Sequence, residues 1–213
     1  MSVISKQSSA DRVIVRNVSW TTYESLLKDL DDHRGPRLAY DRGILEIMSP
    51  FIEHENINWI LASIVDLTLA EMDVDSQNVG MTTFKKEAEK RGFEADSSFY
   101  IRNVDRIRGK KRLDMSIDPP PDLVIEVDVT NDSLNKFPLY ASLKVPEVWR
   151  FRDALEIWIL EQGTYFKQPV SKAIPILTDG IISRLLESGL TSKRTVWLRE
   201  SRATIRAFIS ATS

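Results

Sequence analysis

Residues 119–130 constrain the fold of this chain more than any other segment. Their sequence, PPPDLVIEVDVT, has the apolar content of a strand buried inside a sheet. Glu126 and Asp128 are two residues apart in it, so both side chains project from one face while apolar residues fill the other. Two carboxylates about 4 Å apart repel by roughly 4 kcal/mol at an effective dielectric near 20. A positive charge must offset this repulsion, and a divalent metal ion is one candidate.

The rest of the pattern predicts a mixed α/β fold with one central sheet flanked by helices. Apolar residues at helical spacing predict helices near 21–30, 53–71, 138–143, 181–187 and 195–209, the first opening on a capping box from Thr21 to Glu24. Short apolar runs predict a hairpin over 36–48 and strands near 79–84, 97–101, 123–129, 147–151, 155–160 and 164–168. We expect a single domain over 1–213, with a core over about 36–160 and a C-terminal extension over about 161–213.

The composition excludes several kinds of site. The 213 residues include no cysteine, which rules out disulfides, zinc–thiolate sites and thiol nucleophiles. His33 and His54 are the two histidines, too few for a zinc site with several histidine ligands. Oxygen ligands remain, and these favour magnesium, manganese or calcium.

The net charge and hydropathy of the chain limit the kinds of partner that we expect it to bind. The net charge of −2 argues against a protein that coats nucleic acid through bulk charge, but it leaves room for a local basic groove. The N-terminus has no apolar stretch after a basic region, and no window approaches the length of an apolar membrane span. We therefore expect a cytoplasmic protein without membrane contact.

Two further acids are candidates for the same site. Glu53 lies within about 40° of Ile57 on the apolar face of its predicted helix and so should point toward the sheet. The alternative is a carboxylate that is stabilised at a helix N-terminus by the macrodipole. Asp96 directly precedes a predicted strand, and its alternative role is to bind local backbone N–H groups.

Lys136 completes the candidate set. It follows the acidic strand after a polar turn, so its ammonium can return toward Glu126, although a single lysine is usually on the surface. Asp122 marks the entrance of the strand and could support the site. For Glu126 we favour a functional role, while for Asp128 a solvated sheet face is an equal alternative.

The order of these motifs resembles the PD-(D/E)XK nuclease superfamily, and more narrowly its Uma-type, restriction-endonuclease-like branch. The resemblance covers about residues 36–160, and the matching stretches are 44–50, 53–55, 92–101, 119–130 and 139–149. Each motif is weak alone, and their order and spacing together are fairly specific. The resemblance implies a restriction-endonuclease-like core.

The resemblance also assigns roles to single residues. Asp96 stands at the aspartate of "PD", after an alanine instead of a proline, and Glu126 stands at the acid of "(D/E)XK". Asp128 occupies the lysine position, which departs from the superfamily pattern, but the Uma-type branch similarly lacks this lysine and has a displaced basic residue that Lys136 matches. Glu53 matches the carboxylate that the first core helix often contributes.

These roles imply a metal-dependent endonuclease that hydrolyses DNA. Asp96 and Glu126 would hold one or two Mg²⁺ (or Mn²⁺) ions, and Glu53 or Asp128 would complete the ligand shell. The metal would lower the pKa of a bound water. Lys136 would orient the nucleophile or stabilise the transition state.

We expect DNA contacts from a basic cluster between two predicted strands, formed by Arg106, Arg108, Lys110, Lys111 and Arg112. A solvated loop is the alternative interpretation. The tryptophans 149, 158 and 197 are predicted to be core or interface residues rather than base-stacking platforms. A homodimer is plausible because dimers are the commonest oligomers.

Three rival functions remain open at this stage. The first is a catalytically silent module on the same fold that binds nucleic acid or a protein partner. The second is an interaction protein whose acids form ordinary salt bridges with Lys136 and the arginines. The third, ranked last, is a glycosidase with two carboxylates.

Overall fold

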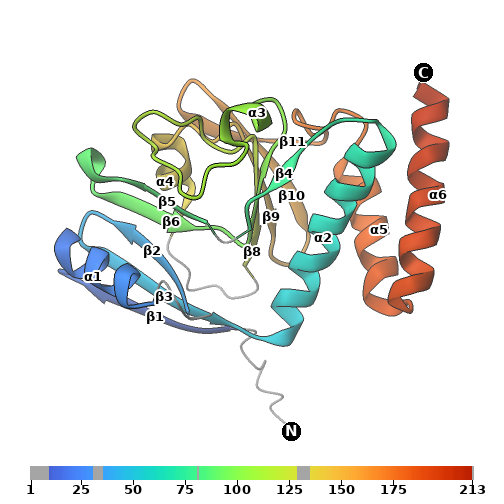
Figure 1. Ribbon diagram of the computed structural model, residues 1–213. Coiled ribbons are helices and arrows are strands. Elements are labelled where there is room, and N and C mark those ends of the chain that lie inside the picture. The colour runs from blue at the N-terminus through green and yellow to red at the C-terminus, as the bar shows by residue number, and fades with distance from the viewer. Residues whose placement is uncertain (1–9, 31–35, 81, 129–134, 213) are drawn as a thin grey trace, which may run out of the picture.

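The fold is built from two β-sheets with helices packed around them (Figure 1). The computed structural model describes residues 10–30, 36–80, 82–128 and 135–212. One sheet is antiparallel, with the strand order β1-β3-β2-β6-β5. The other is mixed, with the order β11-β10-β9-β8-β7-β4, and in it β8 and β9 run parallel.

The antiparallel sheet consists of β1 (Ala10–Arg16), β2 (Arg37–Asp41), β3 (Ile44–Pro50), β5 (Thr83–Lys86) and β6 (Arg91–Glu94). Helix α1 (Trp20–Leu30) covers it with Trp20 and Tyr23, which cluster with apolar side chains of β2 and β3. The close approach of α1 depends on Gly92, because a Cβ atom at this position would collide with the hydroxyl of Tyr23. A short 3₁₀ helix, η1 (Glu87–Glu89), joins β5 to β6.

The mixed sheet separates two hydrophobic clusters. Its strands are β4 (Gln77–Asn78), β7 (Ser97–Tyr100), β8 (Leu123–Val127), β9 (Glu147–Phe151), β10 (Leu155–Glu161) and β11 (Thr164–Gln168). One face is covered by α2 (Ile52–Glu71), α5 (Asp179–Thr191) and α6 (Arg194–Thr212), and the other by α3 (Val104–Ile107) and α4 (Phe137–Ser142) (Figure 1).

Strand β8 is buried on both faces, as its continuous apolar run predicts. Leu123, Ile125 and Val127 pack in the cluster that contains α2, α5 and α6. Val124 lies in the cluster that contains α4. Since side chains alternate along a strand, Glu126 projects toward α4 and the antiparallel sheet.

The α/β class and the predicted helices are confirmed, and the structure adds features that the pattern did not reveal. The expected central sheet is accompanied by a second sheet that includes β1 and β6. The first helix begins at Trp20 rather than at a box from Thr21, because Ser19 Oγ accepts the backbone N–H of Thr22 at 3.0 Å. Among the described helices, none has the length and hydropathy of a membrane span.

Candidate active site

The candidate site lies where the C-terminal end of β8 meets α4. The register of β8 and β9 pairs Glu126 with Arg150, and the Glu126 side chain is nearly buried. Lys136 directly precedes α4, and its Nζ lies 2.8 Å from Glu126 Oε2. The hydroxyl of Tyr140 donates to Glu126 Oε1. Lys136 and Tyr140 are four residues apart, so both reach the carboxylate from one face of α4.

Glu46 is a member of the site that the sequence analysis missed. It lies on β3 and is 1% exposed. Its Oε1 lies 3.7 Å from Lys136 Nζ, and its Oε2 lies 3.6 Å from Nε of Arg12 on β1. The signal was present in the sequence, because an acid inside the apolar run 44–48 is the same anomaly that drew attention to Glu126.

The carboxylate of Asp96 is buried and surrounded by nitrogen atoms of three residues. Its Oδ2 accepts the backbone N–H of Val127 at 2.6 Å and lies 3.2 Å from His54 Nε2. Nη1 of Arg37 donates to Oδ1. Burial by itself raises the pKa of Asp96, but the Arg37 guanidinium and His54 outweigh it and lower the pKa to about 2. Asp96 is therefore ionised at neutral pH although its side chain is fully buried.

The electrostatics show that three carboxylates act on one ammonium. Burial lowers the pKa of Lys136, but Glu126, Glu46 and Asp96, in that order, raise it above its ordinary value. The pKa of Glu126 is raised by burial and by the nearby Asp96, although Lys136 counteracts both. Burial and the Glu126 carboxylate raise the pKa of Tyr140. Lys136 thus stays charged and is the cation at the centre of the site.

Asp128 directly follows β8 and contacts two arginines. Its Oδ1 lies 3.2 Å from Nη1 of Arg12, and its Oδ2 lies 2.8 Å from Nη2 of Arg152. Its backbone N–H donates to the carbonyl of Phe151, which extends the pairing of β8 with β9. Asp128 therefore lies next to the site, but both of its oxygens already contact guanidinium groups.

The structure does not bring Glu53 to these acids. Glu53 is exposed, while the buried face of α2 is centred on His54, Ile57, Asn58 and Leu61. At about 100° per residue, Glu53 falls well off this face. The prediction that Glu53 points inward was therefore wrong, and His54 is the residue of the first turn that reaches the site.

The predicted basic cluster lies at the other end of β7 and β8. Asp122, which precedes β8, accepts the backbone N–H groups of residues 101 and 102 at 2.8 and 2.9 Å and so fixes the start of the segment that carries the cluster. Within the cluster, Arg108 pairs with Asp75 and Lys110 pairs with Asp118. The cluster is thus partly neutralised and does not adjoin the acidic site.

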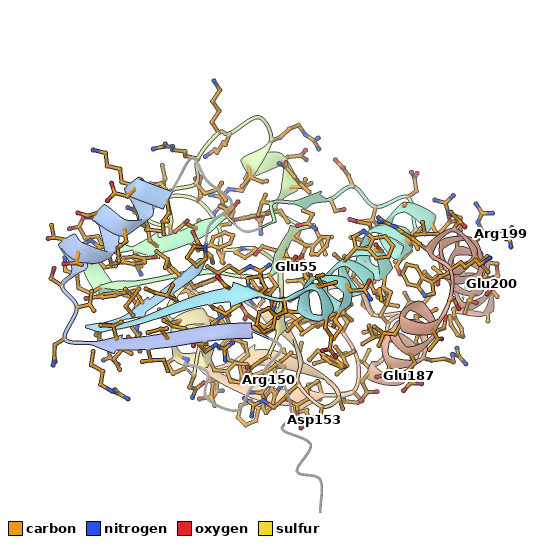
Figure 2. All side chains as sticks on the ribbon, turned by 90° about the horizontal axis from the view of Figure 1, so that it is seen from below. Glu55, Arg150, Asp153, Glu187, Arg199 and Glu200 are labelled. Carbon is orange, nitrogen blue, oxygen red and sulfur yellow. The ribbon has the colours of Figure 1, made fainter. Side chains whose placement is uncertain are left out.

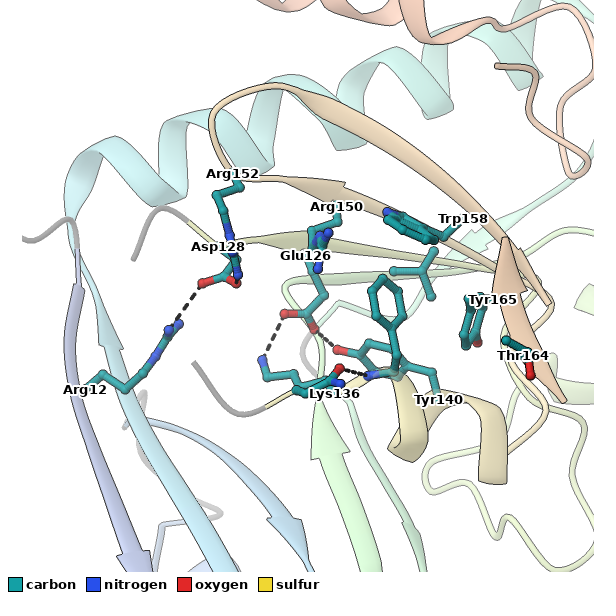
Figure 3. A pocket seen from close by; sticks show the side chains of 13 residues that line it. Arg12, Glu126, Asp128, Lys136, Tyr140, Arg150, Arg152, Trp158, Thr164 and Tyr165 are labelled. Carbon is teal, nitrogen blue, oxygen red and sulfur yellow. Dashed lines mark hydrogen bonds and ion pairs between the residues drawn. The ribbon is translucent and has the colours of Figure 1, made fainter. Parts of the chain in front are cut away.

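A cavity of about 390 Å³ opens beside Glu126. Figure 3 shows Arg12 and Arg152 on one side of Glu126, and Trp158 and Tyr165 on the other. Charged side chains of the C-terminal helices lie elsewhere: Figure 2 shows Glu187, Arg199 and Glu200 to the right of Arg150, on α5 and α6. The cavity is the opening through which a ligand can approach Glu126.

Known proteins share this architecture. The model of the Uma2 family, described as a putative restriction endonuclease, matches residues 20–191, which is most of the chain. The chain belongs to the Uma2 family. The crystal structure of a putative nuclease belonging to DUF820 from Anabaena variabilis ATCC 29413 is similar, with a TM-score of 0.51 and 16% sequence identity over 75% of this chain and 98% of that chain. At this identity the likeness establishes the fold. No curated protein matches the sequence.

In this Uma2 chain the basic residue of the site directly precedes α4 and does not come from β8. The lysine that the superfamily pattern expects at position 128 is an aspartate, and Lys136 reaches Glu126 instead. The site therefore still contains a basic side chain, although position 128 is an aspartate.

Proposed function

We propose that this protein is a metal-dependent endonuclease that hydrolyses phosphodiester bonds in DNA. The observation that carries the proposal is the position of the Lys136 ammonium, 2.8 Å from Glu126 and 3.7 Å from Glu46, beside an open cavity that Lys136 and Glu126 line. The charge of the buried Asp96 also acts on this ammonium. Membership of the Uma2 family and the nuclease fold support it. A cytoplasmic homodimer remains part of the proposal.

The donor set suits a hard divalent cation by its chemistry, because carboxylate oxygens are the ligands that Mg²⁺ and Mn²⁺ prefer. Among the described side chains, no three acidic or histidine residues are grouped closely enough to hold a metal ion as they stand. Mg²⁺ nevertheless needs as few as one or two carboxylates. Asp96 and Glu126 would hold the Mg²⁺ ion. Glu46 would help to complete its ligand shell, the role that the sequence analysis suggested for Glu53. To bind the ion, each carboxylate would have to exchange a partner from the protein: Arg37 for Asp96, Lys136 for Glu126, and Arg12 or Arg152 for Asp128.

The other residues of the site have separate roles in the proposed reaction. A bound metal would supply a water of lowered pKa and a Lewis acid for the scissile phosphate. Lys136 keeps its positive charge and stabilises negative charge that develops on the phosphate. Tyr140 fixes the orientation of Glu126, and Arg37 with His54 keeps Asp96 ionised and oriented.

Incubation with supercoiled plasmid DNA and Mg²⁺ or Mn²⁺ tests the proposal. We expect the wild-type protein to nick or cut the plasmid, and EDTA to abolish the reaction. Glu126→Gln should lower the rate by at least about 100-fold, comparable to the loss of one electrostatic element at other active sites. The matched control is Glu53→Gln, which changes an exposed glutamate outside the site and should leave the rate unchanged.

Two outcomes would contradict the proposal. If neither metal supports cleavage, the alternative of a catalytically silent module that binds nucleic acid or a protein partner is favoured. A specific observation supports this alternative, because Asp96, Glu126 and Asp128 already have cationic partners from the protein. Cleavage that persists unchanged in Glu126→Gln would show that the site lies elsewhere.

A further inference from the structure

The cavity beside Glu126 continues along a wall of aromatic rings. Ring centroids of Phe137 and Trp158 are 5.0 Å apart, and those of Phe137 and Tyr165 are 5.1 Å apart. All three residues line the cavity together with Glu126. The strand register explains the arrangement, because Glu126 lies opposite Arg150 on β9 and Trp158 lies opposite Val148 on the same strand.

Trp158 differs from the tryptophans of the core. Trp149 and Trp197 are fully buried, as the sequence analysis predicted. Trp158 is half-buried. Because side chains alternate along a strand, Trp158 lies on the opposite face of β10 from the buried residues Ile157 and Ile159, and this face borders the cavity. The sequence analysis predicted a core or interface residue, and Trp158 does pack against the cluster that contains α4, but it also lines the cavity.

An arginine already stacks on these rings. The guanidinium carbon of Arg150 lies 4.9 Å from the ring centroid of Phe137 and 5.2 Å from that of Trp158. Glu156 holds Arg150 in this position at 2.6 Å and accepts the indole N–H of Trp158 at 3.1 Å. Aromatic rings and guanidinium planes are the surfaces on which unstacked nucleobases bind.

At the opposite end of the cavity, a phosphate would replace carboxylates that now contact cationic side chains. Arg12, Arg152 and Lys136 line this end, with Asp128 and Glu126 as the acids. The volume of about 390 Å³ is near the lower end of the roughly 300–1,000 Å³ typical of small-ligand sites. A nucleotide is a ligand with both an aromatic base and a phosphate, whereas a base inside a duplex is stacked and cannot enter.

We propose that this cavity binds one unstacked nucleotide of the substrate, with its base against Trp158 and Phe137 and its phosphate beside Lys136. The inference rests on the proposed nuclease function and narrows its substrate to single-stranded DNA or DNA with unpaired nucleotides. Duplex DNA would first have to extrude a base, which costs free energy. The nucleotide in the cavity would place an adjoining phosphodiester bond next to Glu126.

Fluorescence anisotropy in EDTA tests the inference without cleavage. The probe is a labelled strand of about 12 nucleotides, a length that single-strand-binding folds cover, alone or annealed to its complement. We expect the single strand to bind more tightly than the duplex. Trp158→Leu should weaken single-strand binding by between about fivefold and about 100-fold, the range that stacking of a base on an aromatic side chain contributes.

The chain offers a matched control in Trp59. This tryptophan is also half-buried and also lies under an arginine, with the guanidinium carbon of Arg194 at 3.6 Å from the ring centroid, but it lies on α2 and outside the cavity. Trp59→Leu should leave the affinity for the single strand unchanged. Trp158→Phe should restore part of the affinity, which shows that a ring is required and guards against an effect of misfolding.

The outcomes separate this inference from the proposed function. Equal binding of single strand and duplex, or an unchanged affinity in Trp158→Leu, overturns the inference even where the plasmid is cut. A loss of single-strand affinity in Trp158→Leu that Trp158→Phe partly restores supports the nucleotide site. Cleavage of the same single strand with Mn²⁺, by the wild type and by Glu126→Gln, then tests the chemistry independently.

Discussion

At the scale of single residues, the candidate site depends on one ammonium, that of Lys136, whose positive charge offsets the negative charge of three carboxylates. A buried ammonium without partners would lose its proton, because burial disfavours the charged form. Lys136 instead has its pKa raised, since Glu126, Glu46 and Asp96 all act on it. The same position among oxygens is where a divalent ion would find its ligands, so Lys136 and the metal are expected to compete for charge compensation.

This competition predicts the behaviour of Lys136→Met. Without the ammonium the carboxylates repel one another in a buried site, and we expect the free energy of unfolding to fall by about 3–5 kcal/mol in EDTA. Mn²⁺ should restore part of it, up to about 3 kcal/mol at a hundredfold excess over its Kd. Thermal unfolding with and without Mn²⁺ measures both effects.

The control for Lys136→Met is Lys85→Met, which removes a lysine paired with Glu24 at 2.8 Å on the surface. Exposed pairs of this kind contribute at most about 1 kcal/mol, so little change is expected. If Mn²⁺ stabilises Lys136→Met no more than it stabilises the wild type, then the carboxylates around Lys136 do not form the metal site.

The residues that the sequence revealed are those with an unusual chemical type in a clear pattern. Glu126 stood out because carboxylates are rare in buried strands, and Lys136 because it follows that strand closely. Arg37 was not found, since its partner Asp96 is 59 residues away and nothing in the local pattern around Arg37 indicates burial. The contact exists because β2 pairs with β6, which ends two residues before Asp96, and spacing along the chain does not encode this pairing.

At the scale of elements, boundaries and pairings were harder to predict than the elements themselves. The long apolar periodicity of α2 and the apolar run of β8 predicted both correctly. Strand β6 is four residues long and contains Gly92, so its propensity is weak and its pairing with β2 and β5 decides its conformation. Short strands of this kind are fixed by their neighbours, and the second sheet was missed for that reason.

The packing of α5 against α2 yields a prediction at this scale. Replacing a helical glycine by alanine usually stabilises a protein by up to about 1 kcal/mol. At Gly189 a Cβ atom would lie 2.9 Å from Ile60 Cγ2 and 3.0 Å from the Trp197 ring. Ile60 and Trp197 are both fully buried and cannot move aside freely. We therefore expect Gly189→Ala to destabilise the fold by about 1–2 kcal/mol, as overpacking of a core does.

Gly180→Ala is the matched control in the same helix. Its added Cβ would have Thr178 Oγ1 as its nearest neighbour at 3.9 Å, an ordinary contact. This variant should be as stable as the wild type or slightly more stable. Urea unfolding of both variants measures the difference, and equal stability of Gly189→Ala and Gly180→Ala would mean that α5 can shift away from α2.

At the scale of the whole molecule, the two basic regions lie at opposite ends of the same strands. Arg12 and Arg152 adjoin the site at the C-terminal end of β8, whereas the cluster at residues 106–112 belongs to the segment fixed by Asp122 at its N-terminal end. At about 3.3 Å per residue, the five residues of β8 separate these ends by roughly 15 Å. A ligand in the cavity therefore does not reach the predicted cluster.

This separation predicts that the two regions respond differently to DNA length. Lys110→Gln combined with Lys111→Gln should leave the affinity for a strand of two nucleotides unchanged, because one nucleotide occupies the cavity and the second does not reach the cluster. If the cluster contacts phosphates, the same double variant should lower the slope of log affinity against log salt by about 1 per lost contact for long DNA. Binding titrations at several salt concentrations measure both quantities. A weaker affinity for the short strand would mean that the cluster belongs to the site, and the two ends would then have to lie closer in solution than the register of β7 and β8 allows.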